Sequence, residues 1–173
     1  MNESFGLGEE LSILSTVILA VFSMISFSVA SILHSKLLKN EVTCAAVIFG
    51  FSSACALILY FANEYLNSAI ISALLLSLIV AGMHGINLML ITIVPKRFAK
   101  SGKVSTFSGL LNACTYVGAA IATYGVAAIA ESFSWGVTIL VWTGVAALGA
   151  IVCFFVVPVW QRFKKEYAEI KEN

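Results

Sequence analysis

Charged residues are scarce in this sequence. Lys, Arg, Asp and Glu together make up 11% of the 173 residues, whereas apolar residues make up 60%. A typical soluble domain has about 25% charged and about 45–50% apolar residues. A soluble fold of this length leaves much of its chain at the surface, so it could not cover so much apolar side chain. The composition therefore excludes an ordinary soluble domain, and we predict a protein embedded in a lipid bilayer.

Motifs of several other protein classes are also missing. The four cysteines lie inside apolar runs, and none has the C-x-x-C spacing of a zinc or redox site. Gly102 and Lys103 lack the upstream glycine of a phosphate-binding loop. No nucleophile–base pair or dinucleotide fingerprint is visible, and the acidic first ten residues do not resemble a basic secretory leader. We therefore expect neither an enzyme nor a nucleic-acid-binding protein, with no metal and no cofactor.

Five stretches without Lys, Arg, Asp or Glu make up most of the chain: 11–35, 42–63, 65–95, 104–130 and 132–161. Each reaches the roughly 20 residues that a helix needs to cross about 30 Å of hydrocarbon. They do not alternate in polarity as membrane strands do, and a helix satisfies its own backbone amides inside lipid. We predict an all-α membrane protein with about five transmembrane helices, at about 11–36, 43–63, 68–94, 104–130 and 134–158.

The basic residues indicate the orientation of these helices. Short connections make neighbouring helices antiparallel, so the links 36–41 and 95–103 and the tail 159–173 fall on one side. All ten Lys and Arg lie there, while the other side carries Glu64 and Glu131 and the glutamates of residues 1–10. Because Lys and Arg are enriched in cytoplasmic loops, we predict a cytoplasmic tail, an extracytoplasmic leader at 1–10, and insertion in the plasma or inner membrane. The 95–103 link is also basic enough to attract anionic lipid headgroups.

The fourth predicted helix carries a polar stripe. Its members follow helical steps of three, four or seven: Ser105, Ser108, Asn112, Thr115, Tyr116 and Thr123. Small residues such as Gly118 and Ala122 lie between and beyond them, and small residues let helices approach closely in lipid. Two interpretations stay open. The stripe joins helices by hydrogen bonds, or it lines a hydrated cavity in which Asn112 and Tyr116 contact a solute.

The third predicted helix contains His84 and Asn87, three residues apart on one face. His84 is the only ionisable residue, apart from tyrosines and cysteines, that lies deep in any predicted span. A titratable group at this depth indicates function; the alternative is a neutral histidine bonded to a neighbouring helix. Gly82 and Gly85 favour local unwinding or a close helix contact here. His34, at the end of the first span, is expected to be a solvated interfacial histidine.

Residues 82–142 resemble the last part of a major facilitator superfamily transporter. The matching features are Gly85, the Pro-Lys-Arg at 95–97, the pattern S-T-x-S-G-x6-Y-x-G at 105–118, and the Ser-Trp at 134–135. Within the superfamily the segment is most similar to the organophosphate:phosphate antiporters, which include glycerol-3-phosphate and hexose-phosphate transporters. The resemblance implies that the five helices correspond to helices eight to twelve of a twelve-helix fold with a cytoplasmic C-terminus.

The resemblance also implies a function and a site. Such antiporters exchange a small organophosphate for inorganic phosphate between two six-helix halves. Tyr116 falls at the family's solute-facing tyrosine of helix eleven, and His84 falls near an aromatic, solute-facing position of helix ten, where His replaces Tyr. With their neighbours, the expected substrate-binding residues are His84, Asn87, Asn112 and Tyr116. The family's phosphate-binding arginines lie on helices one and seven, which have no counterpart here.

Alternating access requires one helix bundle to rock against another around a central site. Five helices from one half cannot do this alone, so we expect part of a truncated or split transporter that is inactive by itself. Its expected partners are the missing N-terminal helices, a small anionic solute and the lipid bilayer. Two alternatives remain: a major facilitator transporter for a carboxylate, sugar or drug, and a small non-transporting membrane protein that docks a partner through the face around Gly118–Ala122.

Overall fold

The computed structural model describes residues 9–66 and 68–169, and this part of the chain is helical apart from short turns. Its elements are, in order, α2 (Glu9–Ile32), the π-helix η1 (Leu33–Leu38), α3 (Glu41–Tyr65), α4 (Ala69–Asn87), the π-helix η2 (Leu88–Ile93), α5 (Val94–Lys96), the 3-10 helix η3 (Ala99–Ser101), α6 (Val104–Ser132) and α7 (Trp135–Glu169). Five segments are long and apolar enough to cross a membrane: Val17–Leu38, Glu41–Tyr65, Ala69–Lys96, Val104–Ser132 and Trp135–Tyr167. The predicted all-α fold with five spanning helices is confirmed, and the chain is a multi-pass membrane protein.

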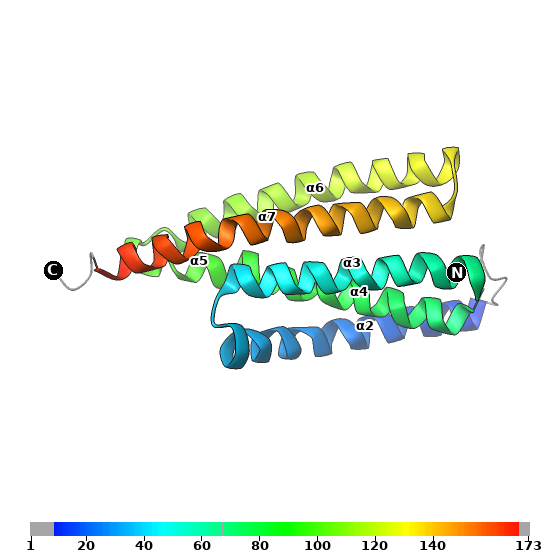
Figure 1. Ribbon diagram of the computed structural model, residues 1–173, viewed down its shortest axis with the longest axis horizontal. Helices are drawn as coiled ribbons and strands as arrows, with labels where there is room; N and C mark the ends of the chain where they lie inside the picture. The colour runs from blue at the N-terminus through cyan, green and yellow to red at the C-terminus, as the bar shows by residue number, and fades with distance from the viewer. Residues whose placement is uncertain (1–8, 67, 170–173) are drawn as a thin grey trace.

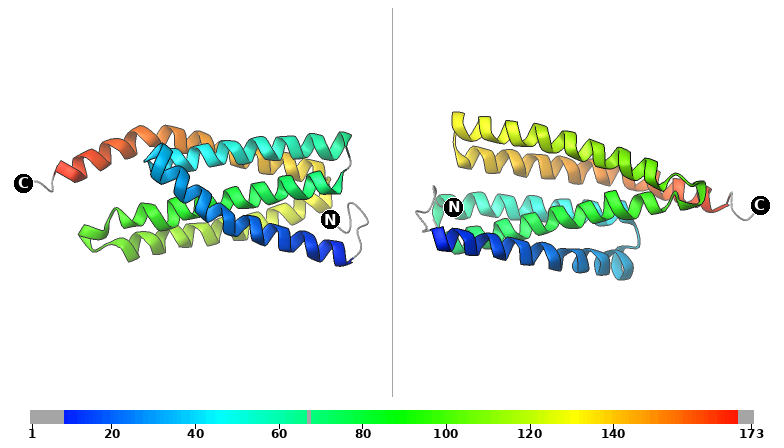
Figure 2. Two further views of the ribbon diagram at one scale, coloured as in Figure 1. Left: turned by 90° about the horizontal axis from the view of Figure 1, so that it is seen from below. Right: turned by 180° about the vertical axis from the view of Figure 1, so that it is seen from behind.

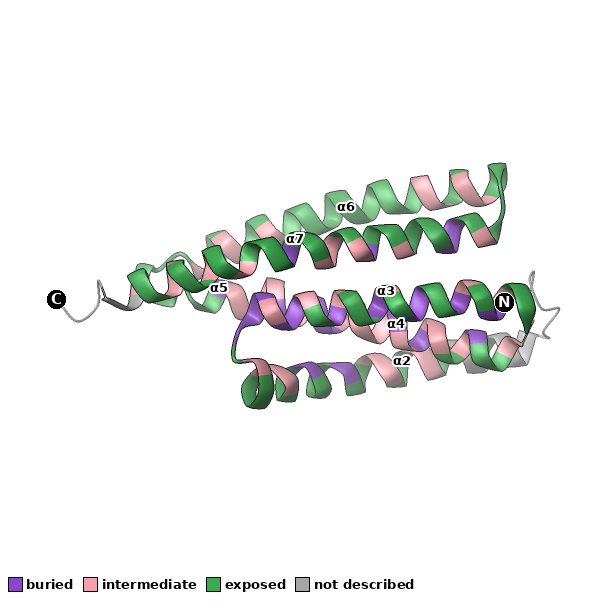
Figure 3. Cartoon of the chain, viewed as in Figure 1, coloured by how far each residue is buried: buried purple, intermediate pink, exposed green. Residues whose placement is uncertain are grey.

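The long helices run antiparallel to their neighbours along one common direction (Figure 1). α3 lies at the centre of the packing, against α7 and α4, and α4 also packs against α2. α3 holds more buried positions than any other described helix, whereas α6 has none (Figure 3). The few contacts of α6 are shared between α7, α5 and η2. The bundle is therefore well packed around α3 and α4 and open along α6.

A tight turn joins η1 to α3. Lys39 has a positive φ of 48°, and Asn40 is extended. The Asn40 Oδ1 atom accepts hydrogen bonds from the amides of Val42 at 3.0 Å and Thr43 at 3.1 Å. These amides have no partner inside the helix, so Asn40 acts as its N-cap. The turn fixes where α3 begins and places Glu41 as its first residue.

Glycines allow the helices to touch at three crossings. A Cβ atom on Gly82 of α4 would overlap the Ser52 hydroxyl of α3, and one on Gly149 of α7 would lie 2.7 Å from the Phe49 ring of α3. A Cβ on Gly85 would lie 3.2 Å from the Ala30 side chain of α2. The glycines of α4 therefore make close helix contacts, one of the two alternatives predicted for them. The helix does change from α-helical to π-helical winding, but only after these glycines, in η2.

α7 is longer than a membrane span requires. Its 35 residues extend for roughly 52 Å at about 1.5 Å per residue, against about 30 Å of hydrocarbon. The predicted span ends at 158, but the helix continues through Pro158 to Glu169, and Figure 2 shows it bending toward this end. The first part of the predicted tail is thus a continuation of α7. Most of the predicted leader, 1–8, and the end of the tail, 170–173, lie outside the described residues.

Candidate functional site

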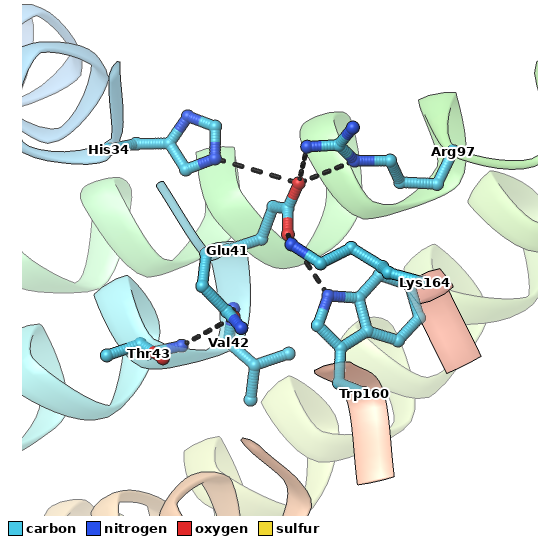
Figure 4. A network of polar contacts seen from close by, with 8 residues as sticks. His34, Glu41, Val42, Thr43, Arg97, Trp160 and Lys164 are labelled. Atoms are coloured by element: carbon cyan, nitrogen blue, oxygen red, sulfur yellow. Dashed lines mark hydrogen bonds and ion pairs between the residues drawn. The ribbon is translucent and has the colours of Figure 1, made fainter. Parts of the chain in front are cut away.

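The most strongly bonded polar centre surrounds Glu41, whose side chain has no exposed surface. Its Oε1 atom accepts a hydrogen bond from the Arg97 Nε atom at 2.6 Å, and the same guanidinium forms an ion pair with it. Its Oε2 atom accepts hydrogen bonds from the Trp160 Nε1 atom at 3.0 Å and the Lys164 Nζ atom at 3.2 Å. These donors converge on both carboxylate oxygens (Figure 4). A buried carboxylate is tolerated when it is paired and hydrogen-bonded in this way.

The donors come from different parts of the chain. Arg97 follows α5 in the link before α6, whereas Trp160 and Lys164 lie on the extension of α7. Glu41 itself is the first residue of α3, directly after the turn from η1. The centre therefore joins the two basic links and the basic tail at one end of the bundle. That these three regions share one side was predicted from the antiparallel order of the five spans, and the contacts place them together.

His34 of η1 is the fifth member of the centre. Its Nε2 atom lies 3.6 Å from the Glu41 Oε1 atom, which is too far for a hydrogen bond, and its side chain is 17% exposed. Within the described part of the chain, this nitrogen has no hydrogen-bond partner. The predicted solvated histidine is therefore wrong for His34, because the turn at Lys39 folds η1 against the start of α3.

The centre carries more positive than negative charge. One carboxylate faces two permanent cations, Arg97 and Lys164, whose side chains are 46% and 24% exposed. Partial exposure lets water and lipid headgroups share the excess charge, as expected at a membrane interface. The described residues hold no cluster of three or more His, Cys, Asp or Glu side chains that could bind a metal. The arrangement can hold the ends of α3 and α7 and the link before α6 together.

His84, the first of the predicted solute-binding residues, bonds to its own helix. Its Nδ1 atom lies 2.9 Å from the Val80 carbonyl oxygen. A carbonyl can only accept, so Nδ1 carries the hydrogen, and in the neutral ring Nε2 is left as an acceptor. The ring also packs edge-on against Phe27 of α2, with centroids 5.8 Å apart. His84 is half-buried and lies beside α2. Within the described residues it does not form the bond to a neighbouring helix that was predicted as its alternative role.

The other three predicted residues are exposed. Asn87 lies at the end of α4, and Asn112 and Tyr116 lie on α6, where Tyr116 is 70% exposed. None of the four, His84 included, lines either of two cavities in the bundle: one of about 440 Å³ between α2, α3 and α4, and one of about 1030 Å³ between α3, α4, α6 and α7. The described chain therefore does not enclose these four residues in one pocket.

The polar stripe of α6 makes no bond to another helix within the described residues. The hydroxyls of Thr115 and Thr123 donate to the carbonyls of Leu111 and Ala119 in the preceding turn, at 2.8 Å each. Such bonds satisfy a hydroxyl inside lipid. The Asn112 amide forms no such bond within the described residues, and an unpaired amide is costly to leave in hydrocarbon. Asn112 therefore needs a further helix or water beside α6, and both interpretations of the stripe stay open.

Reasoning from the sequence missed the Glu41 centre. One signal was available: Glu41 is the only acidic residue in the two basic links, 36–41 and 95–103. It also directly follows Asn40, a residue type favoured at helix N-caps. An acidic residue alone among cations at a helix start is expected to pair with some of them, although the sequence does not say which.

Comparison of the chain with models of protein families, with curated proteins and with solved structures found no match. The resemblance of residues 82–142 to a transporter family is therefore a prediction from motifs.

Proposed function

We propose that this chain forms part of a secondary transporter of the major facilitator type, which exchanges a small organophosphate for inorganic phosphate by alternating access. The motifs of residues 82–142 and the five spanning helices support this proposal. In this arrangement the end of the bundle that carries the Glu41 centre faces the cytoplasm, because that end gathers the Lys and Arg residues. The N-terminus then lies outside, in the plasma or inner membrane.

The observation that carries the proposal is the uncovered polar face of α6. This 29-residue helix buries none of its residues against the rest of the chain, and Asn112 and Tyr116 are both exposed. In a transporter, this face meets the second helix bundle across the solute pathway. The Tyr116 hydroxyl and the Asn112 amide are hydrogen-bond donors, and the oxygens of a phosphate group are strong acceptors.

His84 and Asn87 contribute from α4. With its Nδ1 hydrogen held by Val80, neutral His84 accepts a hydrogen bond at Nε2 from a solute hydroxyl, and the protonated ring pairs with a phosphate. Lys and Arg are missing from the middle of all five helices. The full charge of a phosphate ester therefore needs cations from helices beyond these five, and we propose that the second bundle provides them.

The test is phosphate exchange in proteoliposomes by a transporter that contains these five helices together with the other bundle. A hydrogen bond to a charged group is worth about 1.5–3 kcal/mol, so Tyr116→Phe should lower exchange at least about tenfold. Tyr124→Phe is the matched control, because Tyr124 is also exposed on α6 but outside the stripe; it should change exchange less than about twofold. Equal rates for both variants would leave only a packing role for Tyr116.

Two further arms test the rest of the proposal. Competition by phosphate esters, but not by carboxylates, sugars or drugs, identifies the solute class. The 173-residue protein alone in liposomes should not exchange phosphate, because a single bundle cannot alternate access. Phosphate-dependent uptake by this protein alone would contradict the split-transporter proposal.

One observation favours a second candidate, a small membrane protein that assembles with a partner without transporting. Cβ atoms added at Gly109, Gly118 and Gly125 of α6 would meet nothing within 4 Å. Such a face lets another helix approach closely. The DNA upstream of the Met1 codon distinguishes the two: an open frame encoding about seven more spans favours the transporter, and a promoter directly before Met1 favours the independent protein.

A further inference from the structure

The smaller cavity is an apolar groove between α2, α3 and α4. Residues of α2 and α3 form its walls, and small residues of α4, such as Ala81 and Gly82, form its floor. Ser26 contributes a polar side chain, but its hydroxyl already donates to the Ala81 carbonyl. The interior therefore offers a polar solute no free side-chain partner, whereas a hydrocarbon chain needs none.

The length of the groove along α2 is close to the thickness of one leaflet of a bilayer. Along α2 it extends from Phe22, near the middle of the helix, to Leu33, the first residue of η1. Eleven residues at about 1.5 Å each span roughly 16 Å, and half of a hydrocarbon core of about 30 Å is about 15 Å. Within the Val17–Leu38 span the groove crosses the middle of the bilayer. Its Leu33 end lies in the leaflet on the side of the Glu41 centre, three residues before Lys36.

Two lysines follow the groove at this interface. Lys36 lies in η1, three residues after Leu33, and Lys39 follows η1. Both are exposed, and within residues 9–66 and 68–169 neither forms an ion pair. The carboxylate nearest in sequence, Glu41, is already bound by Arg97 and Lys164. The two ammonium groups are therefore available to an anion at the headgroup level.

We propose that the groove binds one anionic phospholipid of this leaflet. One acyl chain lies between α2 and α3 over the floor of α4, and the phosphate group contacts Lys36 and Lys39. The two exposed lysines just beyond the Leu33 end of this apolar groove favour this occupant over an apolar helix, because such a helix brings no anion to them. This inference depends on the membrane insertion of the chain and is independent of its transport function.

The test is native mass spectrometry of the purified full chain with equal amounts of phosphatidylglycerol and phosphatidylcholine of the same acyl composition. The wild-type protein should retain one phosphatidylglycerol in preference to phosphatidylcholine. Each basic residue near a membrane surface contributes about fivefold in affinity for anionic lipid. Lys36→Gln with Lys39→Gln should therefore remove most of the preference, and Lys36→Arg with Lys39→Arg should keep it.

Two matched controls locate the site. Lys96→Gln with Lys100→Gln makes the same charge change at two exposed lysines of the other link, and the preference should persist. Val47→Trp fills the groove from an exposed position on its wall, whereas Val117→Trp makes the same change on exposed α6, outside it. The first should abolish lipid retention, and the second should not.

Equal retention of both lipids by the wild-type protein would overturn the proposal, and so would an equal loss of the lipid preference in the Lys96→Gln with Lys100→Gln variant. Unchanged lipid retention after Val47→Trp would also overturn it. A dimer that Val47→Trp dissociates would mean that a second copy of the chain occupies the groove. Circular dichroism and elution as a single species check that each variant is folded. A preference that persists in a folded Lys36→Gln with Lys39→Gln variant would overturn the proposal as well. The arginine pair shows that the two positions tolerate substitution when the charge is kept.

Discussion

Replacing Glu41 by glutamine tests whether the ion cluster at the basic end holds the helices together. Glutamine keeps the size of the side chain and one oxygen acceptor but loses the negative charge, so Arg97 and Lys164 are left close together without a counterion. Removing one partner of a fully buried ion pair costs about 3–5 kcal/mol, whereas a surface pair contributes about 0–1 kcal/mol. Arg97 is nearly half exposed and Lys164 about a quarter exposed, so this cluster lies between the two limits. We expect Glu41→Gln to lower the free energy of unfolding by about 2 kcal/mol.

The assay is reversible unfolding of the purified protein in mixed micelles by increasing sodium dodecyl sulfate, followed by circular dichroism. Glu64→Gln is the matched control, because Glu64 is exposed near the other end of the same helix, α3. This control should change the free energy of unfolding by less than about 0.5 kcal/mol. Combining Glu41→Gln with Arg97→Gln should cost less than the sum of the two single changes, because both remove the same interaction.

Two results would refute this account of the centre. One is a decrease in the free energy of unfolding for Glu41→Gln that is as small as the decrease for Glu64→Gln. The other is full additivity in the double variant, which would mean that the carboxylate and the guanidinium do not interact in the membrane.

Two other predictions concern helix packing and helix ends, and the same unfolding assay measures both. Gly149→Ala should destabilise the protein by about 1–2 kcal/mol, because its Cβ would press on the Phe49 ring. Gly144→Ala, with nothing within 4 Å of its Cβ, should be neutral or slightly stabilising; equal effects at both positions would contradict the close contact of α3 and α7. Asn40→Ala should cost about 1 kcal/mol by removing the cap of α3, whereas Asn40→Asp keeps the capping oxygen. Equal losses in these two variants would show that the cap does not matter.

The helices themselves could be predicted from the sequence because membrane insertion depends on local composition. A run of about 20 residues without charge is nearly sufficient to define a span, whatever the rest of the chain does. Once the spans are known, the short connections between them make neighbouring helices antiparallel. The basic links and the tail could therefore be assigned to one side. The end of α7 was less predictable, because the helix continues through Pro158 and past Arg162 into a region that no longer needs to be apolar.

The contacts between helices could not be predicted in the same way. Which cations reach Glu41 depends on how α3 and α7 rotate and tilt against each other, and hydropathy carries no information on rotation. The position of His84 in the sequence suggested a solute contact or a bond to another helix, but the structure shows a bond to the Val80 carbonyl within α4. For Asn112 and Tyr116, the polar stripe on α6 was visible in the sequence, but none of the described residues covers that face.

The measurement that tests the central claim most directly is the labelling of single engineered cysteines by a membrane-impermeant maleimide, in right-side-out vesicles and with the native cysteines replaced by alanine. Five spans with a cytoplasmic basic end predict that Glu64→Cys reacts in intact vesicles and that Lys100→Cys reacts only after the membrane is permeabilised. Reaction of both cysteines from the same compartment would contradict the number of spans, and with it the proposed transporter.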